Sequence, residues 1–195
     1  MEGKTIGKYK TGDVYSYLKG PHDEVNWASI VWSPHGVPRH NFLVWLATLD
    51  RCPTKDRMIS WGLQVSSLCP LCNAAGESRD HLFPECSFSF DLWSLCAPRC
   101  GITPIRQWDR TLTQMRNLRR NKAQRPLRTL TLLVWQAVIY WIWAERNARL
   151  HSNNFKSADS LFSTIDRQIR NKIQTLRESN PSLCSAISQL WFTHA

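Results

Sequence analysis

Residues 69–86 read CPLCNAAGESRDHLFPEC, in which the ligand-type residues follow the spacing Cys-x2-Cys-x8-His-x4-Cys. Zinc binds four nitrogen or sulfur ligands in a tetrahedron, and a Cys-x2-Cys turn allows two thiolates to reach the same ion. The turn after the second cysteine contains a glycine and returns the chain, so that the histidine and the last cysteine complete the shell. The spacing therefore predicts one zinc ion held by Cys69, Cys72, His81 and Cys86.

Four protein ligands leave no open position for water, so this zinc is expected to be structural rather than hydrolytic. Its loss is expected to unfold about residues 65–90. Cys96 and Cys100 form a less regular substitute pair of ligands, whereas Cys52 and Cys184 are most simply buried small hydrophobic residues. The other histidines have no matching ligands and are expected at the surface or at helix caps: His22, His35, His40, His151 and His194.

Outside the cysteine motif, apolar residues recur at three- and four-residue steps, which predicts a mostly α protein with little strand. We expect a helical hairpin that leads into a small Cys-Cys-His-Cys zinc knuckle, followed by a bundle of long helices. Helical patterns cover residues 14–19, 27–32, 37–50, 55–61, 87–96, 126–151, 158–178 and 183–192. Asp13, Thr54 and Ser157 are candidate N-caps of three of these helices.

Two prolines and a glycine close to residue 100 indicate a linker over residues 98–104. The linker would divide the chain into a zinc-binding domain, residues 1–97, and a basic helical region, residues 105–195. The longest apolar stretch, Leu130 to Ala144, has 15 residues. A membrane span needs about 20, so the stretch predicts a buried helix and no membrane association.

The cysteine content also bears on the cellular compartment. Seven cysteines are an odd number, and the first 20 residues are polar, without the apolar segment of a signal peptide. A disulfide framework is therefore not expected, and metal-bound thiolates in a reducing compartment fit better. We expect an intracellular protein, nuclear or cytoplasmic, that is not secreted.

The net charge of +10 is concentrated in the second half of the chain. Residues 1–100 contain ten Lys/Arg and ten Asp/Glu, whereas residues 101–195 contain fifteen and five. Within the basic segment, residues 105–128, one acid (Asp109) stands against Arg106, Arg110, Arg116, Arg119, Arg120, Lys122, Arg125 and Arg128. This predicts binding to RNA or single-stranded DNA, in which Trp108 could stack on a base. The alternative is a solvated basic face with Trp108 in a core, and for Trp108 itself the core position is favoured.

A second candidate function is that of a protein-interaction scaffold. The helix around Trp135, Trp141 and Trp143 would then dock a protein partner, although the same pattern is typical of an internal core helix. No small-molecule substrate is expected.

An enzyme is not expected. The chain has no paired Asp residues of a polymerase palm, no phosphate-binding Gly-x4-Gly-Lys-[Ser/Thr] loop and no Gly-x-Ser-x-Gly elbow. Cys52 with His40 is the only nucleophile and base pair that the sequence offers.

Residues on both sides of the cysteine motif form an ordered series. It comprises Gly7-Lys8-Tyr9, Val14-Tyr15, Trp27, Trp32, Trp45-Leu46-Ala47, Arg51, Pro53-Thr54-Lys55-Asp56-Arg57, Gly62, Cys69-Pro70-Leu71-Cys72, Glu77, Asp80-His81-Leu82-Phe83, Cys86 and Leu92-Trp93. This series, over about residues 5–95, resembles the reverse transcriptase zinc-binding domain. That family is found at the C-terminal end of plant LINE-type (non-LTR) retrotransposon polyproteins and in proteins derived from them.

The resemblance implies that Cys69, Cys72, His81 and Cys86 are the zinc ligands. Pro84 departs from the family pattern, where an apolar residue is more usual. Residues 135–151, with Trp141-Ile142-Trp143 and Glu145-Arg146-Asn147, are similar to the helical tail that often follows this domain. The implied function is that of a non-catalytic zinc-binding module associated with nucleic acid during reverse transcription. The alternative is a decayed fragment that retains no activity.

Overall fold

The computed structural model describes residues 11–20 and 25–193. Over these residues the protein is mostly helical, as predicted, and its only extended pairing is an isolated bridge between Leu68 and Gly76. The helices are α1 (Thr11–Lys19), α2 (Ala28–Val31), α3 (Pro38–Thr48), α4 (Lys55–Ser60), the π-helix η1 (His81–Glu85), α5 (Ser87–Cys96), the 3-10 helix η2 (Ala97–Cys100), α6 (Trp108–Arg116), α7 (Arg125–Ser152), α8 (Ala158–Gln174) and α9 (Pro181–Thr193).

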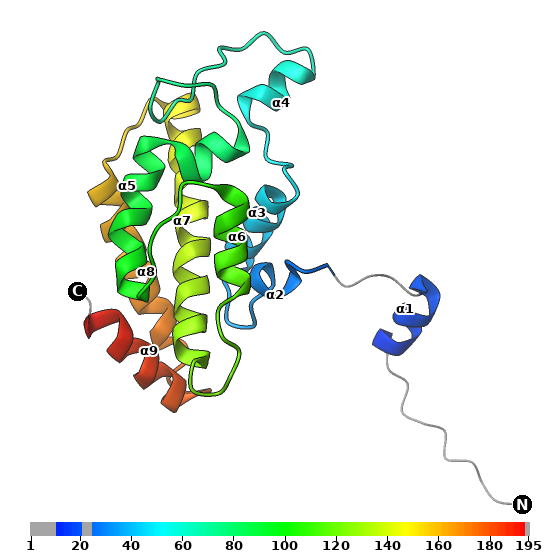
Figure 1. The fold of residues 1–195 in the computed structure, drawn as a ribbon, viewed down its shortest axis with the longest axis vertical. Coiled ribbons are helices and arrows are strands. Elements are labelled where there is room, and N and C mark those ends of the chain that lie inside the picture. The colour runs from blue at the N-terminus through cyan, green and yellow to red at the C-terminus, as the bar shows by residue number, and fades with distance from the viewer. Residues whose placement is uncertain (1–10, 21–24, 194–195) are drawn as a thin grey trace, which may run out of the picture.

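Helix α7 is the central element of the fold. It runs through the middle of the bundle and packs against α3, α5, α8 and α9 (Figure 1). Its middle is apolar on nearly all sides because neighbours cover nearly all sides; Leu130, Trp135 and Ile142 are each 0–2% exposed. Its length and the mean hydropathy of 1.3 in its most apolar 18-residue window would suffice for a membrane span, but 67% of that window is buried within the fold.

The predicted linker is part of the same core. Helix η2 occupies residues 97–100, with Ala97 and Cys100 fully buried, and it packs on α7 and α9. Helix α5, from before the linker, packs on α8, from after it. Residues before and after the predicted linker thus share one packed core. Whether residues 1–97 and 105–195 can fold independently stays a prediction.

Ser157 and Thr54 occupy the predicted N-cap positions, whereas Asp13 does not. Ser157 caps α8 as expected, because its hydroxyl oxygen accepts a hydrogen bond from the amide of Ser160. Helix α1 begins at Thr11, so Asp13 lies inside it rather than at its cap. Thr54 occupies the cap position of α4 in extended conformation, but its side chain makes no capping hydrogen bond. The amide of Lys55 instead donates to a carboxylate 22 residues away, that of Glu77.

His40 lies in the core, which corrects its prediction as a surface or capping residue. Its ring stacks on Tyr140 with centroids 4.4 Å apart. The carboxamide of Gln168 accepts from the indole of Trp141 at 2.7 Å, so its nitrogen is left to donate to His40 Nε2 at 3.1 Å. That geometry requires a neutral imidazole. Burial, and then the charge of Arg39, lower the pKa of His40 to about 4.

Lowering the pH from 7 to 5 is therefore expected to cost about 2 kcal/mol of folding free energy through His40. The unfolded chain takes up this proton near pH 6.5 and the folded chain only near pH 4. The stabilisation is thus fully present above pH 6.5 and is lost as the pH falls toward 4. Urea unfolding of wild type and His40→Gln at both pH values measures it. An equal pH-dependent loss in the two proteins would contradict the assignment.

Candidate metal centre

The four predicted ligands converge on one point. One ligand atom from each of Cys69, Cys72, His81 and Cys86 lies within 4.8 Å of all the others. The sulfurs of Cys69 and Cys86 are 3.9 Å apart, and the Cys72 sulfur is 3.2 Å from His81 Nε2. Zinc bonds of about 2.3 Å to sulfur and about 2.0 Å to nitrogen set tetrahedral edges of about 3.8 Å and about 3.5 Å. The cluster therefore fits a tetrahedral zinc ion with three thiolates and one imidazole.

The local backbone explains why these side chains meet. The amide of Cys69 donates to Ala75 O and the amide of Asn73 donates to Cys69 O, which closes the turn between the first two ligands. Asn73 has φ of 52°, a left-handed conformation that asparagine tolerates better than most residues. The other two ligands stand at the ends of η1, where the amide of Cys86 donates to His81 O. One turn and one short π-helix thus supply all four ligands.

The two buried cysteines of the cluster share a proton when no cation competes for it. The Cys69 thiol donates to the Cys86 sulfur, which lowers the pKa of Cys86 and raises that of Cys69. A zinc ion supplies the positive charge that would allow both to be thiolates. The sequence chemistry and the geometry therefore agree on a cation at this position.

Helix α7 holds the zinc loop from behind. The carboxylate of Glu77 forms a buried ion pair with Arg146, with 2.8 Å between Oε1 and Nη2, and both side chains are at most 1% exposed. Arg146 also donates to Pro53 O at 3.2 Å, and the amide of Glu77 donates to Ser67 O at 2.8 Å. This one ion pair therefore ties together the start of α4, the zinc loop and α7.

A second arginine of α7 supports the turn between the first two ligands. Arg149 donates to Leu71 O at 2.9 Å, and its guanidinium lies 4.4 Å from the ring of Phe88 on α5. Glu145 pairs with Arg149 at 2.8 Å and also accepts from the amide of Lys156. The polar end of α7 is therefore a scaffold for the metal centre.

These supporting residues were not predicted as site residues. Glu77 and Glu145-Arg146-Asn147 were noted only for their family resemblance. The available signals were an acid, Glu77, between the predicted ligands and a charged end, residues 145–149, on an otherwise apolar helix. The sequence could not indicate that the two would meet, because 69 residues separate Glu77 from Arg146.

The other cysteines lie apart from the cluster. Among the residues that the structure describes, the one group with three or more clustered ligand-type side chains contains neither Cys96 nor Cys100. Cys52 and Cys184 are buried, as expected for small hydrophobic residues. Cys96 and Cys100 are buried as well. Burial raises the pKa of Cys52 and of Cys100 to about 12, so these thiols stay protonated near neutral pH.

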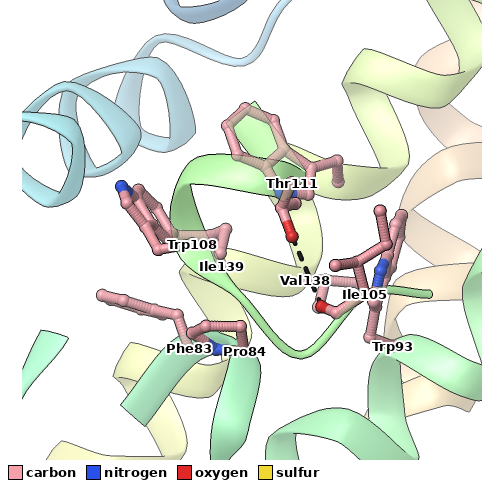
Figure 2. A pocket seen from close by; sticks show the side chains of 9 residues that line it. Phe83, Pro84, Trp93, Ile105, Trp108, Thr111, Val138 and Ile139 are labelled. Carbon is pink, nitrogen blue, oxygen red and sulfur yellow. Dashed lines mark hydrogen bonds between the residues drawn. The ribbon is translucent and has the colours of Figure 1, made fainter. Parts of the chain in front are cut away.

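A small apolar cavity lies beside the metal centre (Figure 2). Phe83 and Pro84 of η1 line it together with Trp93, Trp108 and Thr111. Its volume is about 20 Å³, which is room for about one water molecule. Pro84 therefore contributes to the packing around this cavity and is not one of the four ligands.

The basic segment forms part of the surface. Arg106, Arg110, Arg119, Arg120, Lys122 and Arg125 are exposed, and Arg116 and Arg128 are half-buried. Trp108 is only 3% exposed and lies between Phe83 and Trp135, with ring centroids 5.6 Å and 6.3 Å away. The favoured core position of Trp108 is therefore confirmed, and its ring is not free to stack on a base.

The tryptophans of α7 belong to the core or its border. Trp135 is buried, Trp141 and Trp143 are half-buried, and the Trp141 indole donates to Gln168. This arrangement agrees with the core-helix alternative. A protein partner for this helix stays a prediction.

The segment that contains all four ligands and the loop around them can be compared with known families. Residues 9–93 match the family model described as zinc-binding in reverse transcriptase. The match confirms the resemblance predicted for this segment, which is a little under half of the chain. No curated protein and no solved structure gives a significant match.

The family match and the geometry support each other. The reverse transcriptase zinc-binding family model includes Cys69, Cys72, His81 and Cys86, and the structure brings these residues together. Helices α6 to α9, including the scaffold residues Arg146 and Arg149, lie outside the matched segment. The plant LINE-type origin stays a prediction.

Proposed function

We propose that the protein is a non-catalytic module, stabilised by a structural zinc ion, that binds RNA or single-stranded DNA through its basic segment inside the cell. The zinc centre organises the fold and leaves no coordination position for a substrate. The basic segment supplies the contacts to phosphate. In this proposal the zinc centre and the basic segment belong to one packed fold. The metal ion therefore affects nucleic-acid binding only by stabilising that fold.

The charge distribution at the surface carries this proposal. Over residues 11–20 and 25–193, none of the eight cations of the basic segment pairs with a carboxylate. Two of the five acids in the second half, Glu145 and Asp166, are already paired with arginines elsewhere. The excess positive charge is therefore available to a polyanion. A nucleic-acid backbone is a polyanion, and its neutralisation by arginine and lysine releases counterions, which favours binding.

Charge reversal within the basic segment is expected to weaken binding to a single-stranded oligonucleotide and to reduce its salt dependence. The slope of log K against log salt for single strands is about 0.7 per neutralised phosphate. Arg116→Glu/Arg119→Glu/Arg120→Glu should therefore lower its magnitude by about 2. Fluorescence anisotropy with labelled RNA and DNA oligonucleotides at several salt concentrations measures both quantities.

A matched triple variant tests whether position matters rather than net charge. Arg51, Arg167 and Arg177 are exposed and lie outside the basic segment, and their reversal changes the net charge by the same amount. This control should bind nearly as wild type. Equal losses in both variants would point to non-specific charge, and absence of binding by wild type at low salt would refute the proposal.

A further inference from the structure

Three arginines converge on a hollow between α2 and the start of α7. The arginine hollow is lined by Ser29, Trp32, His35, Arg120, Arg125 and Arg128, among others. Helix α2 lies against α6, and the segment that leads from α6 to α7 carries Arg120 (Figure 1). Residues that are distant in sequence thus form one concave, basic surface. Within the described part of the chain, no acidic side chain lines it.

The guanidinium groups are held in place although they repel one another. Arg120 Nη2 donates to Ser29 Oγ at 2.6 Å, and Arg128 Nη2 donates to Ser29 O at 3.0 Å. Burial and the neighbouring charge of Arg120 lower the pKa of Arg128. The buried Nε of Arg128 has no hydrogen-bond partner among the described residues. Several guanidinium groups around one hollow, together with an N–H donor that lacks an acceptor, are typical of a site that binds an anion.

One aromatic side chain that lines the arginine hollow, Trp32, is exposed and continues into a small aromatic cluster. Trp32 is 48% exposed and its ring centroid lies 6.3 Å from that of Trp45. Phe42 is 52% exposed and lies 5.6 Å from the same Trp45 ring. A large aromatic face left open beside a cationic hollow is the arrangement that single-stranded nucleic acid uses, with phosphate in the groove and a base on the ring.

We propose that the arginine hollow binds a backbone phosphate of single-stranded nucleic acid and that Trp32 stacks on the adjacent base. This inference rests on the proposed function and gives it a location. Arg125 and Arg128 neutralise the phosphate, and the unpartnered Nε of Arg128 donates to a phosphate oxygen. Trp32 reads no sequence, because every base offers a π face. The arginine hollow should therefore bind single strands of any base sequence, and both RNA and DNA.

Separate variants distinguish the two contacts. Trp32→Ala should weaken binding of an eight-nucleotide oligouridine or oligothymidine roughly five- to 150-fold without changing the salt dependence. Trp32→Phe should restore part of the affinity. Trp61→Ala is the matched control, because Trp61 is 56% exposed on the distant zinc-loop side of the molecule and should leave binding unchanged. Arg125→Gln/Arg128→Gln should lower the magnitude of the salt slope by about 0.7, because the two arginines neutralise one phosphate.

The ligands in the titration separate nucleic acid from free phosphate. An abasic oligonucleotide should bind wild type and Trp32→Ala equally, while inorganic phosphate and pyrophosphate should compete only weakly. Circular dichroism and zinc content confirm that each variant is folded. If wild type binds oligonucleotides but the Trp32 and Arg125/Arg128 variants bind equally well, the hollow is not the site, although the proposed function stands. If wild type binds none, both proposals fall.

Discussion

Removal of zinc is expected to unfold the loop around the metal centre while helices α7, α8 and α9 stay folded. Cys69 and Cys86 are fully buried, and a zinc ion would join them to Cys72 and His81, whose ligand atoms lie within 4.8 Å. The loop has little core of its own, since Trp61, Leu63 and Leu68 are 40–56% exposed. Zinc binding in small modules contributes on the order of 10 kcal/mol, so few other contacts can replace it.

The structure narrows the segment that should open. The sequence predicts loss of about residues 65–90, but Leu82, Phe83, Leu92 and Trp93 are at most 5% exposed and pack into the common core. The segment before His81 has only a few backbone hydrogen bonds, among them Cys69 to Ala75 O and Glu77 to Ser67 O. New protease sites should therefore appear first within residues 61–80.

Limited proteolysis with and without a chelator, mapped by mass spectrometry, measures this opening. Metal analysis should find one zinc per chain in wild type. Cys72→Ser should lose the metal and show the same cleavage without chelator. Cys184→Ala is the control, because Cys184 is buried outside the cluster and should retain zinc. Unchanged protection of residues 61–80 after complete zinc removal would contradict the structural role.

Replacement of Glu77 by glutamine is expected to destabilise the protein by about 3–5 kcal/mol. The change keeps the shape of the side chain but leaves the Arg146 guanidinium charged and buried without its counter-ion. Arg146 cannot discharge this penalty by losing its proton, because guanidinium remains protonated in proteins. The zinc loop loses its anchor to α7 at the same time, so zinc affinity should fall as well.

Two further variants make this test specific. Asp80→Asn removes the partner of Arg79 in a surface pair whose side chains are 18% and 51% exposed, and should cost less than about 1 kcal/mol. The double variant Glu77→Leu/Arg146→Met removes both buried charges. Its loss of folding free energy should be clearly less than the sum of the losses in Glu77→Leu and in Arg146→Met. Urea unfolding in saturating zinc gives these free energies. Additive single-variant effects would show that the pair does not act as a unit.

Some features of the chain were accessible from local sequence, and others were not. Leu161, Ile165, Ile169 and Ile173 recur on one face of α8 and are all buried, because helical periodicity depends only on neighbours in the chain. The N-cap at Ser157 is equally local. The N-cap position of Thr54 is local too, but the acceptor for the first amide of α4 is the carboxylate of Glu77, which approaches through the fold.

Histidine and tryptophan show the same distinction. Nothing beside His40 in the chain indicates burial; Tyr140 and Gln168, which enclose it, lie 100 and 128 residues further on. Trp108 stands within a basic segment, and its burial depends on Phe83 and Trp135 from other elements. For such residues the chain pattern leaves two environments open, and packing selects one.

The sequence by itself determined the mostly helical fold and the four side chains that converge as the candidate metal centre, because ligand spacing and helical periodicity are set within short stretches of chain. Tertiary structure alone decided that Glu77 meets Arg146, that His40 is held neutral and that Arg120, Arg125 and Arg128 face one hollow. These are contacts between distant segments, and they form only where burial of the common core brings those segments together.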